Sequence, residues 1–174
     1  MSEQETPPPT SGEQPGITAL SASVRKVQEA LRASGLSGDV LEFAESTRTS
    51  ADAAKRLGCE VGQIAKSLVF RAQTSGRPIL VIASGANRVN EWRVGVLLKE
   101  VLEKAEAALV RQATGFAIGG VPPVGHPQPL PTYIDQDLMP YPHIWAAAGT
   151  PSAVFQLTPT DLVRITRGTV VKVT

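Results

Sequence analysis

Four consecutive apolar residues, Ile79-Leu80-Val81-Ile82, constrain the fold of this chain more than any other feature. Successive side chains of a strand point to opposite faces of its sheet. A strand that is apolar at every position, rather than at alternate positions, therefore indicates burial on both faces. The sequence predicts such a fully buried strand over residues 78–83.

Hydrophobic periodicity, helix caps and chain breakers place the remaining elements. Ser50 and Asn90 are predicted N-caps, and Gly58 is expected to take the left-handed position after a helix. Helices are expected over 21–33, 51–57, 105–113 and 159–165, and a further helix that begins after Asn90 is expected to carry Trp92 and Val96 on one side. Strands are expected over 40–44, 63–72, 116–118, 132–135, 144–148, 153–157 and 169–173. Because strands and helices do not alternate regularly, the prediction is an α/β (α+β) fold with a mixed, barrel-like β-sheet surrounded by helices.

Length and composition indicate one domain. The 174 residues are enough for one core, and the first sixteen are rich in Pro, Ser, Thr, Glu and Gln. We expect a disordered tail over 1–16 and a single folded domain over 17–174. The 17 Lys and Arg residues nearly balance the 16 Asp and Glu residues, so any contact with a nucleic acid must be local. No signal peptide or membrane-spanning segment is recognisable, which makes a cytoplasmic location the default expectation.

Lys66 stands out in the predicted strand over 63–72. Side-chain alternation places it on the same face as Ile64, Leu68 and Phe70. A buried ammonium group needs an anion or another partner, so a lysine placed in this way can bind a ligand or polarise a carbonyl group. The alternative is a lysine whose aliphatic stem packs inward while its head reaches water. Periodicity alone leaves both interpretations open.

A second unusual segment is rich in glycine and proline and runs from Gly115 to His126. Glycines let a backbone approach a ligand closely, whereas Pro122 and Pro123 stiffen the chain and donate no N–H. The amides of Gly119, Gly120 and Val121 are the available donors, and such donors can bind a carbonyl oxygen or an oxyanion. The alternative is a tight turn between strands. The segment lacks the patterns of a P-loop and of a dinucleotide-binding loop.

Taken together and in this order, these segments resemble the YbaK/EbsC family and the editing domain inserted in bacterial prolyl-tRNA synthetase. The resemblance covers about residues 21–174. It implies a barrel-like mixed sheet and hydrolysis of the ester that joins a small amino acid to the terminal ribose of tRNA, chiefly tRNA(Pro) or a related tRNA. The matching stretches are TSADAAK (49–55), QIAKSLVF (63–70), ATGFAIGGVPPVGH (113–126), PTYID (131–135) and the region of Gly149.

The resemblance also implies a set of site residues. Lys66 matches the essential lysine of the family, and Gly119, Gly120 and Val121 supply the amides of its Gly-x-x-x-Pro loop, which ends at Pro123. His126 follows this loop, although a surface histidine is the simpler interpretation. The remaining expected substrate-binding residues are Thr47, Ser67, Asp135 and Gly149.

The expected chemistry is attack of water on the ester carbonyl, without a covalent intermediate, a cofactor or a metal. His126, His143 and Cys59 are too few for a typical zinc site. The expected partner is the acceptor end of a mischarged tRNA, with an aminoacyl-tRNA synthetase as a further partner and no membrane or DNA. Two rival functions stay open. One is a non-catalytic module that binds aminoacyl-nucleotide ligands, and the other is an interaction protein that uses its proline-rich tail.

Overall fold

The apolar run of the sequence forms β3 (Pro78–Ser84), which lies inside a mixed eight-stranded sheet. The structure, a computed structural model, describes residues 21–174; the predicted tail over 1–16 lies outside the described residues. The strand order is β1-β7-β6-β2-β3-β5-β8, and β4 pairs with β2 beyond this path. The other strands are β1 (Leu41–Glu42), β2 (Ile64–Ala72), β4 (Leu102–Lys104), β5 (Thr132–Asp135), β6 (Ile144–Ala147), β7 (Ala153–Leu157) and β8 (Thr169–Val171).

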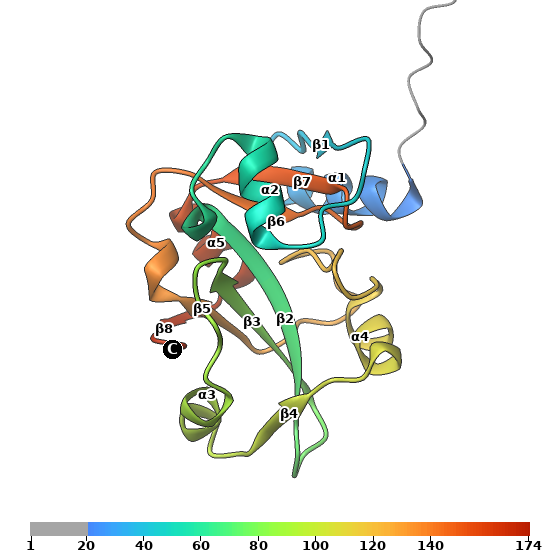
Figure 1. Ribbon diagram of the computed structural model, residues 1–174. Coiled ribbons are helices and arrows are strands. Elements are labelled where there is room, and N and C mark those ends of the chain that lie inside the picture. Colours follow the sequence, from blue (N-terminus) through green and yellow to red (C-terminus); the bar gives the residue numbers. More distant parts are fainter. Residues whose placement is uncertain (1–20) are drawn as a thin grey trace, which may run out of the picture.

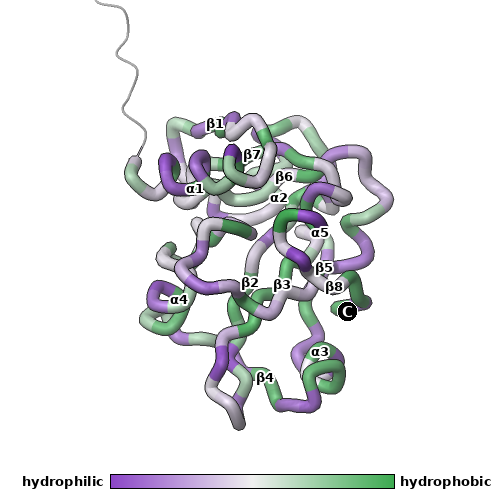
Figure 2. The backbone as a smooth tube through the Cα atoms, turned by 180° about the vertical axis from the view of Figure 1, so that it is seen from behind, coloured by the Kyte–Doolittle hydropathy of each residue, from purple (hydrophilic) through white to green (hydrophobic). Residues whose placement is uncertain are grey.

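Burial of β3 on both faces is confirmed. Leu80 and Ile82 belong to the larger hydrophobic cluster, whereas Ile79, Val81 and Ala83 belong to a second cluster on the opposite face. All five side chains are fully buried. In the hydropathy view, hydrophobic residues concentrate along β3, and hydrophilic ones are conspicuous in α1 (Ala22–Ala33) (Figure 2).

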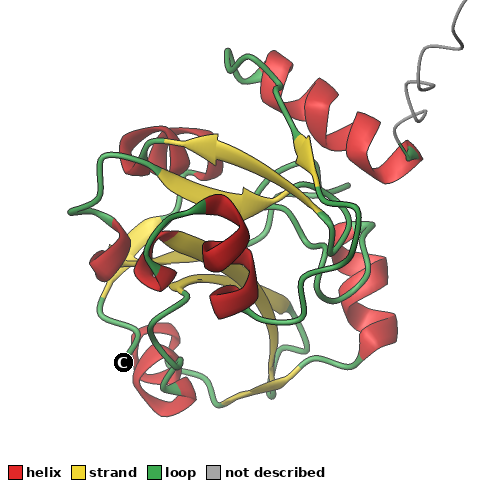
Figure 3. Cartoon of the chain, turned by 45° about the horizontal axis from the view of Figure 1, so that its top comes forward, coloured by secondary structure: helices red, strands yellow, loops and turns green. Residues whose placement is uncertain are grey.

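Helices surround the sheet (Figures 1 and 3). Val27 of α1, Val110 of α4 (Ala107–Thr114) and Leu162 of α5 (Pro159–Thr166) pack into the larger cluster. Val94 of α3 (Glu91–Leu98) packs into the second cluster, and α2 (Ser50–Leu57) covers the end of β2. The predicted class, a mixed sheet ringed by helices, is confirmed. The sheet does not close into a ring by pairing, because β1 and β8 are its two ends.

Two local predictions are wrong. Residues 116–118 form no strand: Gly115 has a φ of +80°, and the Thr114 hydroxyl accepts a hydrogen bond from the Phe116 amide at 3.1 Å, so the chain turns there. The N-cap of α2 is Thr49 rather than Ser50, because the Thr49 hydroxyl accepts the bond from the Asp52 amide at 3.1 Å. Asn90 caps α3 as predicted, and Gly58 has a φ of +67°.

Within residues 21–174, none of the helices combines the length and the apolar character that a membrane crossing requires.

Candidate active site

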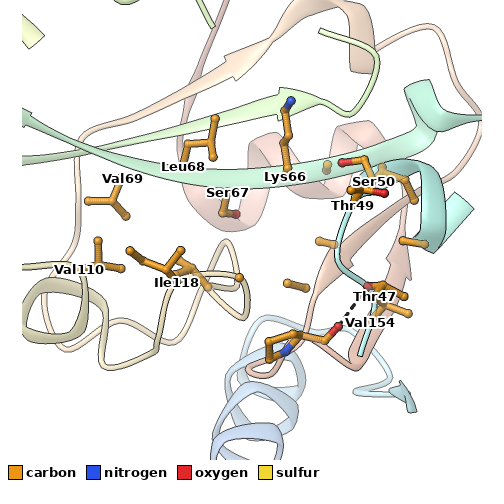
Figure 4. Close-up of a pocket in the computed structure, with 18 of the residues that line it drawn as sticks. Thr47, Thr49, Ser50, Lys66, Ser67, Leu68, Val69, Val110, Ile118 and Val154 are labelled. Carbon is orange, nitrogen blue, oxygen red and sulfur yellow. Dashed lines mark hydrogen bonds between the residues drawn. The ribbon is translucent and has the colours of Figure 1, made fainter. Parts of the chain in front are cut away.

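A cavity of about 530 Å³ lies beside the middle of β2 (Figure 4). Strand β6 pairs with β2 at Ile64 and Ala65, and β4 pairs with it from Phe70 onward. The four residues between these pairings have β3 as their strand partner on one side and the cavity on the other. The other walls come from residues 47–50, 88–91, 104–110, 118–121 and 145–154.

Lys66 is half-buried at this cavity, and its ammonium group donates a hydrogen bond of 2.6 Å to the main-chain oxygen of Asn87. Lys66 and Leu68 point to one side of β2, while Ser67 and Val69 point to the other, toward Ile118 (Figure 4). Burial lowers the pKa of Lys66 below its ordinary value, and the negative charge of Asp135 opposes this effect. Lys66 is thus intermediate between the two interpretations that the sequence left open. It is only partly buried, and the carbonyl group of Asn87 binds its ammonium group.

A buried network lies behind this carbonyl group. The Asp135 carboxylate is 1% exposed and accepts hydrogen bonds from the Ser84 amide at 3.0 Å and from the Asn87 side chain at 2.9 Å. The Asn87 side chain also donates to Asp137 at 2.7 Å. These bonds fix the turn that follows β3 and therefore the position of the oxygen that holds Lys66.

Asn87 and Ser84 were missing from the predicted site. The available signal was weak: a polar pair around Gly85, directly after a buried strand, is typical of many turns. Asp135 was predicted to bind substrate. The structure places its carboxylate in the network rather than in the cavity wall.

The glycine-proline loop contributes two residues with unengaged amides to the cavity lining. Gly119, with a φ of +91°, and Val121 both line the cavity. In the described part of the chain their N–H groups donate no hydrogen bond. The amide of Gly120 is not available, in contrast to the prediction, because it donates to Ala117 at 3.1 Å.

Gly120 and Gly149 join this loop to the turn between β6 and β7. The Gly149 amide donates to the Gly120 oxygen at 3.0 Å. A Cβ atom on Gly120 would lie 2.8 Å from the Gly149 oxygen, and one on Gly149 would lie 2.7 Å from the Ser23 oxygen. Neither glycine lines the cavity; both permit the close contacts that hold the loop beside it.

Pro123 and His126 also lie outside the cavity lining. The His126 ring places Nε2 2.7 Å from the Pro122 oxygen, which ties the ring to the loop. Burial lowers the pKa of His126, the Pro122 oxygen opposes this effect, and the charge of Lys26 adds to it. The neutral ring is therefore favoured.

The two predicted pocket hydroxyls differ in their partners. Thr47 lines the cavity, but its hydroxyl donates to the Pro151 oxygen at 3.1 Å (Figure 4). The Ser67 hydroxyl is buried and has no hydrogen-bond partner among residues 21–174. A buried hydroxyl without a partner is costly, and a ligand in the cavity could supply one.

Lys66, Ser67, Gly119 and Val121 thus belong to the lining of one cavity, although Lys66 points to the opposite side of β2 from Ser67 and Ile118 (Figure 4). Ammonium and amide donors of this kind can stabilise an oxygen that gains negative charge. The family model of the aminoacyl-tRNA editing domain matches residues 44–165, which include every residue that lines this cavity. The chain belongs to the aminoacyl-tRNA editing domain family.

Similar proteins agree with this assignment. A solved structure described as a candidate trans-editing enzyme for prolyl-tRNA synthetase is 48% identical, with a TM-score of 0.84 over 88% of this chain and 98% of the other. An uncharacterised Bacillus subtilis protein, YwhH, is 31% identical over 124 residues, 71% of this chain and 78% of that protein. A candidate Cys-tRNA(Pro)/Cys-tRNA(Cys) deacylase, EbsC of Enterococcus faecalis, is 26% identical over 136 residues, 76% of this chain and 82% of its own length.

The cavity of this editing domain has a basic margin. Arg48, Arg88 and Lys104 line it together with one acidic residue, Glu91. Arg48 and Arg88 are far apart in the sequence, and only the fold brings them to the same cavity. Among the described residues, no cluster of three or more His, Cys, Asp or Glu side chains is suited to a metal ion.

Proposed function

We propose that this protein is a free-standing aminoacyl-tRNA deacylase, which hydrolyses the ester between a small amino acid and the terminal ribose of a mischarged tRNA. The observation that carries the proposal is that Lys66 lines the same cavity as Gly119 and Val121, whose amides donate no hydrogen bond among the described residues. The descriptions of the relatives make tRNA(Pro) the first tRNA to test. A role in translation would place the protein in the cytoplasm.

The proposed reaction is direct hydrolysis. Water attacks the ester carbonyl, assisted by the ribose hydroxyl or amino group of the substrate, and negative charge develops on the carbonyl oxygen. The amides of Gly119 and Val121 and the ammonium group of Lys66 stabilise this charge. Lys66 has three N–H donors and gives one to Asn87, so two remain for the substrate. The proton taken from water leaves with the ribose oxygen.

The basic margin supports the proposed partner. Arg48, Arg88 and Lys104 can meet phosphates of the acceptor end, while the chain as a whole carries a formal charge of +1. Binding would then be local and weak, and a synthetase that holds the same tRNA would raise its effective concentration.

The test is ester loss from a panel of mischarged tRNAs, with Lys66→Ala and the matched surface variant Lys172→Ala. We expect Lys66→Ala to lower the rate about 10²–10³-fold, the usual effect of losing one donor to a developing oxyanion. Lys172 is exposed and lies outside the cavity, so its variant should keep the full rate. Full activity of Lys66→Ala would exclude the proposed role, and binding without turnover by the wild type would instead indicate a non-catalytic module.

A further inference from the structure

The main-chain groups of β2 alternate between its two edges. Ile64 accepts from the Gly85 amide at 2.7 Å and Ala72 donates to Arg77 at 2.9 Å, so the even-numbered residues bond toward β3. Gln73 donates to Val101 at 2.8 Å, on the opposite edge. Because N–H and C=O directions alternate along a strand, the odd-numbered residues face that opposite edge.

This opposite edge is bare in its middle. Ala65 faces β6 and Arg71 faces β4, but no described strand pairs with Ser67 or Val69 on this side. No side chain of the described residues bonds to their main-chain groups either. The N–H groups of both residues and the C=O of Ser67 therefore have no partner among the described strands, whereas the Phe70–Lys104 pairing sets the C=O of Val69 opposite the amide of Ala105. Both residues line the cavity.

The Ser67 hydroxyl adds a separate indication at the same place. Its oxygen is buried and unpartnered within residues 21–174, although hydroxyl groups buried in this way nearly always have a partner. Lys66 lies next to it, at the same cavity. A bound ligand with its own donors and acceptors could supply the hydrogen-bond partners that these groups lack among the described residues.

We propose that the bare edge of β2 at Ser67 and Val69 binds the α-aminoacyl group of the substrate as a one-residue extension of the sheet. The ester carbonyl of the ligand accepts from an N–H of this edge, and its α-ammonium group donates to a C=O. Extended peptides are recognised in this way at open sheet edges, where main-chain bonds supply affinity. The inference rests on the proposed function and names the part of the substrate that is held: the α-amino acid unit common to all aminoacyl esters.

The test is amide hydrogen exchange measured by NMR with a stable substrate analogue, 3′-(alanylamino)-3′-deoxyadenosine. In the free protein, the amides of Lys66 and Leu68 should exchange slowly because they bond to β3, and those of Ser67 and Val69 should exchange fast. The analogue should slow exchange at Ser67 and Val69 at least about tenfold. The surface variant Lys172→Ala, which lies outside the cavity, should show the same protection.

A second probe, the propanoyl analogue without the α-amino group, tests the ammonium contact. It should bind about five- to tenfold more weakly, the effect of one lost hydrogen bond. Unchanged exchange at Ser67 and Val69 on saturation with the alanyl analogue, or equal affinity of both analogues, would overturn the proposal. Deacylation of mischarged tRNA is measured in parallel: if it proceeds while the edge stays unprotected, only the strand-edge proposal fails, and if both are absent the proposed function fails too.

Discussion

Two opposing effects act on the proton of Lys66. Burial disfavours the ammonium form, whereas the carboxylate of Asp135 favours it, and the net result is a lowered pKa. The oxygen of Asn87 fixes the ammonium group between these influences. Asp137 binds the same Asn87 side chain, and Arg88 and Glu91 lie at the cavity margin. The pKa of Lys66 thus depends on Asp135, whose carboxylate does not itself line the cavity.

Asp135→Asn is expected to lower the pKa of Lys66 further, because it removes the charge that opposes burial. If the ammonium form is active, the alkaline decline of the deacylation rate should then begin at a lower pH. The pKa can be measured by NMR titration with ¹³C-labelled lysine. Asp137→Asn is the matched control: its side chain shares Asn87, but it does not contribute to the pKa of Lys66, which should stay in place. If Lys66 has the same pKa in the wild type and in both variants, the charge of Asp135 does not influence it.

His126 should make the folded protein sensitive to mild acid. Its pKa is lowered in the fold, so between that value and the ordinary value of about 6.5 the unfolded chain binds more protons. The free energy of unfolding should therefore fall as the pH drops below about 6.5. Urea denaturation at pH 7.5 and 5.5 measures this change. His126→Gln can still donate to the Pro122 oxygen and should lose less unfolding free energy between pH 7.5 and 5.5 than the wild type. If the variant loses as much as the wild type, groups other than His126 cause the acid sensitivity.

At the level of elements, the glycine-proline loop is held by its contact with the turn between β6 and β7. Gly120→Ala would place a Cβ atom 2.8 Å from the Gly149 oxygen, which belongs to the backbone and cannot move freely. We expect a loss of about 1–3 kcal/mol in the free energy of unfolding. Ile118→Ala in the same loop removes a side chain that is 60% exposed and should change stability by less than about 0.5 kcal/mol. Urea denaturation of both variants checks the contrast; equal stability would show that the contact relaxes.

Sequence predicted most elements because each carries a local signal. The cap at Asn90, the glycine after α2 and the apolar run of β3 act through neighbours in the chain. The strand expected at 116–118 failed because three apolar residues between glycines do not outweigh turn geometry. Strand pairing, in contrast, depends on residues far apart in the sequence. The gap in the edge of β2 lies between the pairings with β4 and β6, and the sequence of residues 63–72 alone does not predict it.

The same distinction applies to the candidate site. Lys66, Gly119 and Val121 were identifiable because each violates a local expectation or matches the family resemblance, and all three line one cavity. The use of the Gly120 amide within its own loop, and the support of Lys66 by Asn87, depend on distances that only the folded chain sets. The roles of these residues in hydrolysis stay predictions.

For the molecule as a whole, electrostatic attraction to tRNA should come from the cavity margin alone. The formal charge of +1 offers no general field, so Arg48 and Arg88 should carry much of the salt dependence. Replacing both with alanine should raise KM and reduce the slope of log kcat/KM against log salt by about 1–2, since each phosphate contact contributes about 0.7–0.9. The exposed Lys172→Ala should leave the slope unchanged. A slope equal to the wild type in the double variant would place the tRNA elsewhere.

The two strands that bound the gap in β2 reach it at very different times during synthesis. Strand β4 follows β2 closely in the chain, whereas β6 begins only at Ile144. A growing polypeptide that ends before Ile144 already contains Lys66 and the glycine-proline loop, yet one side of the opening is missing. The cavity is therefore completed late in synthesis, only once β6 has been made and can pair with β2.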